Sequence, residues 1–121
     1  METRLLLLMI LCHVIDDFVL QPASLSNLKQ KKFWWRDWNE LYKHDYKMAL
    51  FIHSISWSIT ILLPAIFLTQ AGQTTLLIAF IVNASVHYIV DDLKANMGKI
   101  NLVTDQTIHL IQVIVTWAAI I

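Results

Sequence analysis

Four long apolar segments make up most of this chain and leave few ways for it to fold. They cover about residues 4–21, 48–68, 75–93 and 105–121. With its flanking residues, each is long enough to cross a bilayer as a helix, which rises ~1.5 Å per residue and needs about 20 residues. The chain is 57% hydrophobic and 15% charged, whereas soluble domains are about 25% charged. Because so few charges can hardly cover a water-facing surface, we expect the bilayer to be the solvent.

The length of 121 residues leaves room for one domain. Short connections between the later segments make neighbouring helices antiparallel. The sequence therefore predicts an all-α fold, with residues 1–121 forming one integral-membrane domain built as a four-helix transmembrane bundle. The first segment follows Arg4 as a signal peptide would, but it runs into His13 and Asp17 without a small-residue cleavage site. We therefore expect this segment to be retained.

The connection between the first two segments mixes large aromatic residues with charges. Over residues 33–42, one helical face carries apolar and aromatic side chains: Trp34, Trp38, Leu41 and Tyr42. This pattern predicts a short amphipathic helix that lies in the headgroup layer between the first two spans. An aromatic-rich loop packed on the bundle is the alternative.

The basic residues predict how the chain is oriented. Eight of the nine lysine and arginine residues lie in two connections, about 22–47 and 94–104, and Arg4 lies on the other side. The positive-inside rule places such basic connections in the cytoplasm. We therefore expect a multi-pass protein of the inner, cytoplasmic membrane with both termini outside. The formal net charge of zero gives no indication of nucleic acid as a partner, so membrane lipids are the expected partners.

Histidine and aspartate recur four residues apart in three of the four segments. The pairs are His13 with Asp17, His87 with Asp91, and Asp105 with His109. One helical turn separates the members of each pair, so both project from the same helix face. The order is reversed in the last pair, where the chain direction also reverses, so every aspartate lies nearer the cytoplasm. His53 lies about 9 Å into the second segment, at a similar depth.

Ionisable side chains are expensive inside a bilayer, at about 2.5–3.5 kcal/mol each on insertion scales. They should therefore face inwards and pair with each other or bind an ion. Imidazoles and carboxylates together suit a divalent metal, with zinc favoured over manganese or iron, and this set is large enough for one or two ions. The predicted metal ligands are His13, Asp17, His53, His87, Asp91 and His109. The alternative is a layer of packing histidines and internal ion pairs.

Asp105 and Lys94 are predicted to take part in the reaction of the substrate, in addition to the six metal ligands. Asp105 is a candidate general base, or else another ligand. Lys94 lies one turn beyond Asp91, where it can bind an anion, or else snorkel to the headgroups as an anchor. Asp16 and Asp92 can bridge ions, orient the ligands, or simply face the headgroups.

These motifs resemble those of a known family. The stretch from His13 to Gln21 is similar to the His-x-x-x-Asp-Phe-x-Leu-Gln opening of a small integral-membrane family of bacteria and phages whose function is unknown. The likeness continues in the same order through the later motifs: His53, His87-x-x-x-Asp91-x-x-Lys94 and Asp105-Gln106-x-x-His109. That family in turn resembles inner-membrane metal-dependent hydrolases. The resemblance thus implies a bacterial inner-membrane location and hydrolytic activity.

Three functions are compatible with these observations. The leading hypothesis is a metal-dependent, phosphoesterase-like hydrolase that acts on a phosphoester or lipid-like substrate, such as a lipid phosphate, near the cytoplasmic face. A small membrane regulator or phage accessory protein with a structural His/Asp metal site is the second. An ion or proton pathway is the third, disfavoured because the carboxylates cluster on one side of the membrane. A chain of this size is also a candidate for homo-oligomer formation.

Overall fold

The computed structural model describes residues 2–35 and 40–121, and the regular elements in these ranges are all helices. The long helices are α1 (Glu2–Ile15), α4 (Asp45–Leu68), α5 (Gln73–Ala95) and α6 (Leu102–Ile120). A π-helix, η1 (Asp16–Leu20), continues α1. Two short helices follow, α2 (Ala23–Leu28) and α3 (Lys31–Trp35). The prediction of an all-helical fold is confirmed, and each long helix lies in one of the apolar segments.

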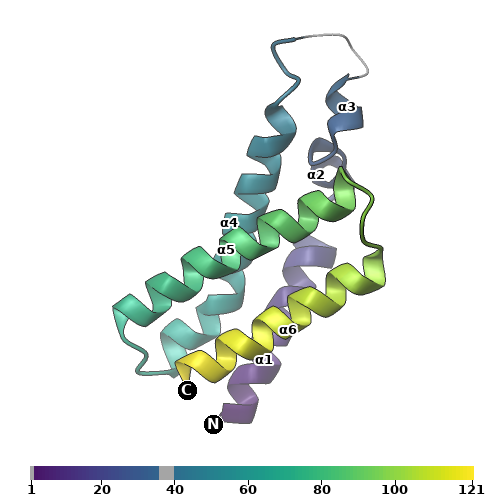
Figure 1. The fold of residues 1–121 in the computed structure, drawn as a ribbon. Coiled ribbons are helices and arrows are strands. Elements are labelled where there is room, and N and C mark those ends of the chain that lie inside the picture. Colours follow the sequence, from purple (N-terminus) through teal and green to yellow (C-terminus); the bar gives the residue numbers. More distant parts are fainter. Residues whose placement is uncertain (1, 36–39) are drawn as a thin grey trace.

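The long helices pack around a shared interior. Both α1 and α5 contact α4 and α6, so each long helix touches two of the others (Figure 1). One half of the interior is apolar and contains large side chains from α1, α4 and α6: Leu5, Met9, Trp57, Ile61, Leu62, Ala65, Val113 and Ile120. This core occupies the half of the molecule that lies nearer the chain termini. Polar side chains fill the other half.

The chain termini lie at one end of the molecule and the basic connections at the other. At one end the chain termini come together (Figure 1). There Trp117 donates a hydrogen bond from its indole to the Glu2 carbonyl (3.0 Å). At the other end the two basic connections meet. There the Asn96 side chain donates to the Lys29 carbonyl (3.0 Å) and accepts from the Lys31 backbone N–H (2.6 Å). Connections distant in the sequence are thus joined over the polar half of the interior.

Two of the helices in the described residues, α4 and α5, are long and apolar enough to cross a membrane by length and composition. The first apolar segment is divided, because α1 has 14 residues before the chain continues as η1. Length and hydropathy therefore support two of the four predicted spans, those of α4 and α5.

The aromatic connection is described on both sides of residues 36–39, which lie outside the described residues. Helix α3 ends at Trp35, and residues 40–44 form turns; Trp38 lies outside the described residues. The Trp35 indole donates to the Lys43 carbonyl (3.2 Å). The ring of Trp34 lies beside that of Tyr42, and α3 contacts α4. The predicted interfacial helix is thus confirmed over 33–35 and wrong over 40–42, where these contacts accompany turns.

Candidate metal centre

Polar side chains from every long helix meet inside the half of the molecule nearer the basic connections. The residues that form this His/Asp cluster are His13, Asp16, Asp17, His53, His87, Asp91, Asp105 and His109. Their burial is nearly complete, since His87, Asp105 and His109 are 0% exposed and His53 is 2% exposed. The helical spacing that the sequence contains therefore brings the predicted residues together in space.

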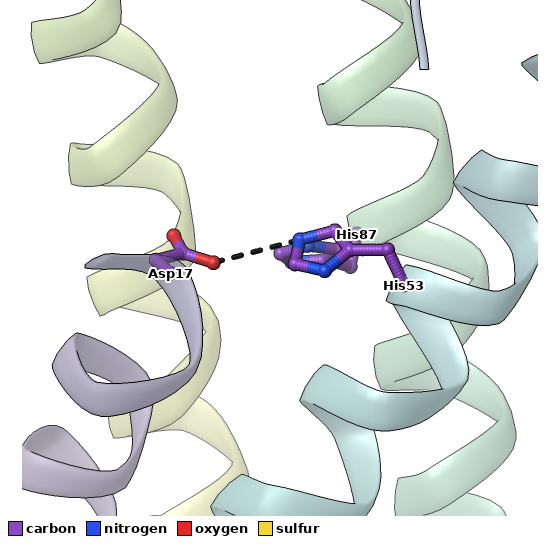
Figure 2. Close-up of side chains that lie close together, drawn as sticks. All are labelled: Asp17, His53 and His87. Carbon is purple, nitrogen blue, oxygen red and sulfur yellow. Dashed lines mark ion pairs between the residues drawn. The ribbon is translucent and has the colours of Figure 1, made fainter. Parts of the chain in front are cut away.

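The first group with metal-ligand geometry comes from η1, α4 and α5. Asp17, His53 and His87 each offer one ligand atom, and these atoms lie within 4.8 Å of one another. Figure 2 shows Asp17 directed at the two imidazoles, with Asp17 Oδ1 3.7 Å from His53 Nε2. The centroids of the two imidazole rings lie 5.0 Å apart. We call this group the first triad.

The second triad comes from α5 and α6 and shares one histidine with the first. It consists of His87, Asp91 and His109, whose ligand atoms again lie within 4.8 Å. Asp91 Oδ1 is 3.5 Å from His109 Nε2, and Asp91 Oδ2 is 3.7 Å from His87 Nε2. Asp91 Oδ2 is also 3.6 Å from His53 Nε2. The two triads are therefore one connected site.

The cluster contains buried polar atoms that lack hydrogen bonds. Within residues 2–35 and 40–121 these are Asp17 Oδ1, His53 Nε2, His87 Nδ1 and Nε2, Asp105 Oδ1 and His109 Nε2. A buried polar atom without a partner costs about 1–3 kcal/mol. The N···O separations around these atoms, 3.4–3.7 Å, are too long for hydrogen bonds. All of these atoms belong to the triads or to Asp105, so the free-energy cost of unsatisfied polar burial falls on this one site.

The separations match what a coordinated ion requires. Ligand atoms about 2.0–2.1 Å from a tetrahedral Zn²⁺ lie about 3.3–3.4 Å from one another. In the triads the contacts between imidazole nitrogens and carboxylate oxygens are 3.5–3.7 Å and all ligand atoms lie within 4.8 Å of one another, so the side chains would move closer together to receive such an ion. Each triad has two histidines and one aspartate, and three protein ligands leave a coordination position open, as in catalytic zinc sites. These residues therefore fit a divalent metal.

The formal charges also leave room for a cation. The cluster holds the carboxylates of Asp16, Asp17, Asp91 and Asp105, and two lysines pair with it, Lys29 and Lys94. With neutral imidazoles, two negative charges are left without a counter-charge among these residues. Uncompensated buried charge is strongly unfavourable. For four ionised carboxylates and neutral imidazoles, a single divalent cation would supply the missing charge.

Asp16 supports the cluster from outside the triads. Its Oδ2 lies 3.7 Å from His53 Nδ1, on the opposite side of the ring from the nitrogen that faces the first triad. Its Oδ1 accepts hydrogen bonds from Ser56 (3.2 Å) and Thr60 (3.0 Å). If this 3.7 Å gap closed to a hydrogen bond, the carboxylate would fix the orientation of a metal-binding imidazole. The sequence left the role of Asp16 open, and the structure places it beside His53.

The neighbouring aspartates of the π-helix both reach the cluster. Adjacent residues of an α-helix point about 100° apart, and the π-turn brings them somewhat closer together. In η1 the turn is wider, and each carboxylate lies beside His53. Single turns of π-helix are frequent at functional sites. Nothing in the local sequence distinguishes this turn from the α-helix before it.

His13 lies beside the triads rather than within them. Its Nδ1 accepts a hydrogen bond from the Trp57 indole (3.0 Å). A neutral imidazole carries one N–H, so this bond leaves the proton of His13 on Nε2 and neither nitrogen free for a metal. Asp17 Oδ2 is 3.7 Å from the same Nδ1. The prediction that His13 is a ligand is not supported by this arrangement, which instead suits a packing role.

Two lysines enter the cluster from the basic end. Lys94 donates to Asp105 Oδ2 (2.5 Å) and lies 4.0 Å from Asp91 Oδ1. Lys29 is only 3% exposed and donates to Asp91 Oδ2 (2.5 Å). The sequence pointed to Lys94 through its spacing from Asp91. It gave no such signal for Lys29, which follows α2 and is 62 residues from its partner.

Of the two carboxylate oxygens of Asp105, only Oδ2 accepts hydrogen bonds. Its Oδ2 accepts hydrogen bonds from Lys94 and from the Gln106 side chain (3.1 Å), which also donates to Asp17 Oδ2 (2.9 Å). Its Oδ1 has no hydrogen-bond partner and lies 3.4 Å from His109 Nε2. The free oxygen thus faces the second triad. An oriented carboxylate of this kind is suited either to coordinate a metal or to accept a proton.

These features define a small helical protein with a buried histidine–aspartate centre that can hold a divalent metal. Residues 5–121 match the family described as Protein of unknown function (DUF3307), and the chain belongs to this family. The prediction of a family of unknown function is thereby confirmed. Neither the curated proteins nor the solved structures contain a match to the chain.

Proposed function

We propose that this protein is a metal-dependent hydrolase of the cytoplasmic membrane that acts on phosphoesters of lipid-like molecules. The observation that carries the proposal is the pair of overlapping triads whose ligand atoms are buried without hydrogen bonds. A cluster built only to hold helices together would satisfy those atoms internally, because each unsatisfied one costs stability.

The proposed centre uses five of the residues that the sequence singled out. The ligands would be Asp17, His53, His87, Asp91 and His109, with zinc as the favoured ion. Bound zinc lowers the pKa of a coordinated water to about 7 and so supplies a nucleophile near neutral pH. Asp105 is the proposed base: Lys94 and Gln106 hold its Oδ2, which leaves Oδ1 directed at the second triad.

The distribution of polar and apolar side chains supports a membrane location for all of the long helices. The half of the interior nearer the basic connections contains imidazoles and carboxylates, whereas large apolar side chains point outwards, with Phe67 79% and Val19 70% exposed. Soluble proteins rarely expose contiguous apolar patches larger than a few hundred Å². Lipid is the solvent that suits an apolar outer surface of this kind. The basic connections would then face the cytoplasm, with the metal centre just beneath them.

The proposal is tested first by metal content. Protein purified in detergent without chelators is expected to contain about one zinc ion per chain, measured by inductively coupled plasma mass spectrometry. His87→Ala removes the ligand that both triads share and should abolish zinc binding. His44→Ala is the matched control, because His44 is exposed and lies outside the cluster. Folded wild-type protein that neither contains nor takes up zinc, manganese or iron would refute the proposal.

Activity is tested on the same samples. Zinc-loaded protein in nanodiscs should release phosphate from a lipid phosphate, and His87→Ala should not. A metal-loaded wild-type protein without activity on any phosphoester would favour a second function, a membrane regulator with a structural metal site. The ion pairs of Lys29 with Asp91 and of Lys94 with Asp105 favour that alternative, because they stabilise the cluster without any substrate.

An ion or proton pathway is less well supported. Beyond the cluster, towards the chain termini, the interior is filled by apolar residues such as Met9, Ile61 and Val113, each 0% exposed. On this side of the described cluster a permeating ion would meet neutral polar groups, the mutually bonded side chains of Asn83, Gln112 and Thr116, before it reached the apolar core, and an ion at membrane depth is costly. Flux of zinc or protons into proteoliposomes would establish such a pathway.

A further inference from the structure

A cavity of about 280 Å³ lies at the basic end of the molecule, next to the His/Asp cluster. Its lining comes from the stretch between η1 and α3, from the start of α3 and from the end of α5, and includes Gln21, Ser26, Lys29, Gln30, Lys32 and Lys94. All of these side chains carry hydrogen-bond donors, and half of them carry a positive charge. Acidic side chains are absent from the lining that the structure describes. The cavity is therefore suited to an anion.

The lysines connect this cavity to the proposed metal centre. Lys29 donates to Asp91, a member of the second triad, and Lys94 contacts both Asp91 and Asp105. An ammonium group carries three donors, so a lysine anchored on a carboxylate can also donate to an anion on its other side. An anion held by these lysines would consequently lie beside the triads. Lys32, on α3, is exposed at the same cavity.

We propose that this cavity binds the phosphate group of the substrate, with Lys29, Lys32 and Lys94 as the binding cations. This inference rests on the proposed function and assigns the part of the site that recognises the substrate. A phosphate monoester carries nearly two negative charges at neutral pH and several acceptor oxygens. Lysine binds such groups as a point charge, and the Gln21, Gln30 and Ser26 side chains add neutral donors.

The surroundings of the cavity favour a phosphate that belongs to a lipid. Gln21 lines the cavity, and the two residues before it, Val19 and Leu20, are large, apolar and 70% and 55% exposed. An acyl or isoprenoid tail could lie along these side chains while its phosphate reaches the lysines. A soluble phosphoester offers the lysines the same chemistry, so the binding experiment includes both.

Metal and phosphate are expected to bind cooperatively. Asp91 now has Lys29 as its charge partner at 2.5 Å. A divalent ion in the second triad would share that carboxylate, which frees part of the lysine's charge for an anion. Linkage requires that phosphate then strengthens metal binding by the same factor as metal strengthens phosphate binding.

The experiment uses the full chain in phosphatidylcholine nanodiscs, with inorganic phosphate and a short-chain phosphatidate as probes in calorimetric titrations. Lys32→Gln is the decisive variant, because Lys32 is exposed and its replacement should not impair folding. It should weaken binding of the probes about tenfold, equivalent to ~1.4 kcal/mol, without altering zinc content. Lys99→Gln, an exposed lysine outside the cavity lining, is the control and should bind as the wild type does. Lys29→Gln and Lys94→Gln should weaken binding further.

The outcomes separate this inference from the proposed function. Wild-type protein that binds zinc but neither phosphate probe, or lysine variants that bind phosphate unchanged, would overturn the phosphate site alone. Lysine-dependent phosphate binding in protein that takes up no metal would support the cavity and overturn the metal centre. Tighter binding of phosphatidate than of inorganic phosphate supports a lipid substrate, and the opposite ranking supports a soluble phosphoester at the same lysines.

Discussion

The indole of Trp57 donates a hydrogen bond to His13 Nδ1 over 3.0 Å and at the same time stacks on the ring of His87. The stacked rings are 4.3 Å apart with an interplanar angle of 22°. Trp57 also belongs to the apolar core, where it is 0% exposed. One side chain thus orients two histidines that have different roles: His87 belongs to both triads, and His13 supports them.

This relationship predicts that the two histidines differ in metal binding. His87→Ala should abolish zinc binding, whereas His13→Ala should retain zinc at close to wild-type stoichiometry. His13→Ala should still reduce stability by about 1–3 kcal/mol, because the Trp57 N–H loses its buried acceptor. Zinc content and thermal unfolding of both variants provide the measurement. Equal loss of zinc in the two variants would show that His13 is a ligand after all.

Asp16 should act on the metal through His53. Asp16→Asn removes the negative charge next to His53 Nδ1 but leaves a side chain of the same size that can still bond to Ser56 and Thr60. Loss of such an outer partner typically lowers metal affinity about 10–100-fold. We expect a shift of this size in a competition titration with a zinc chelator.

The control for this titration is Asp45→Asn, in the first turn of α4 and outside the cluster. It should leave zinc affinity unchanged. If Asp16→Asn binds zinc as tightly as the control, then Asp16 serves only to join η1 to α4.

Much of this centre could be predicted from residue spacing. A histidine and an aspartate four residues apart share a helix face, and reversal of their order in an antiparallel helix keeps them at the same depth. In the structure, both members of the pair in α5 and the pair in α6 accordingly reach one site. The all-helical fold followed from the apolar segments in the same way, since both features depend on local periodicity.

Other parts of the centre depend on contacts that have no local pattern. Lys29 meets Asp91 only through the tertiary packing of α2, which contacts α4. The tautomer of His13 is set by Trp57, which is 44 residues away in the sequence. No signal in the sequence marks the π-helix η1, in which Asp16 and Asp17 both lie beside His53. Tertiary packing decides each of these features, so spacing alone could not reveal them.

The buried pair of Lys29 and Asp91 should be important for stability. Lys29→Met keeps the length of the side chain but leaves Asp91 without its nearest counter-charge. Removal of one partner from a buried pair costs about 3–5 kcal/mol. We therefore expect a large decrease in the unfolding midpoint in chelator-treated protein, and a partial recovery on addition of zinc, which compensates the same carboxylate.

Lys43→Met is the matched control, because Lys43 forms a similar pair with Glu40 at the surface. Exposed pairs contribute little in high dielectric, so this variant should unfold as the wild type does. A Lys29→Met protein that is as stable as this control would indicate that Asp91 is not charged in the folded chain.

Asp105 should separate metal binding from hydrolysis. Asp105→Asn keeps the volume and the bond from Lys94 can be retained, but the amide cannot accept a proton as a base. Because Asp105 lies in neither triad, zinc content should be close to that of the wild type, while phosphate release should decrease by a factor of about 10²–10⁴, as for loss of a general base. The variant must be compared at matched zinc occupancy, with Thr107→Val, on the exposed face of α6, as the control. Loss of zinc together with activity would instead assign Asp105 as a ligand, and unchanged activity would remove it from the chemistry.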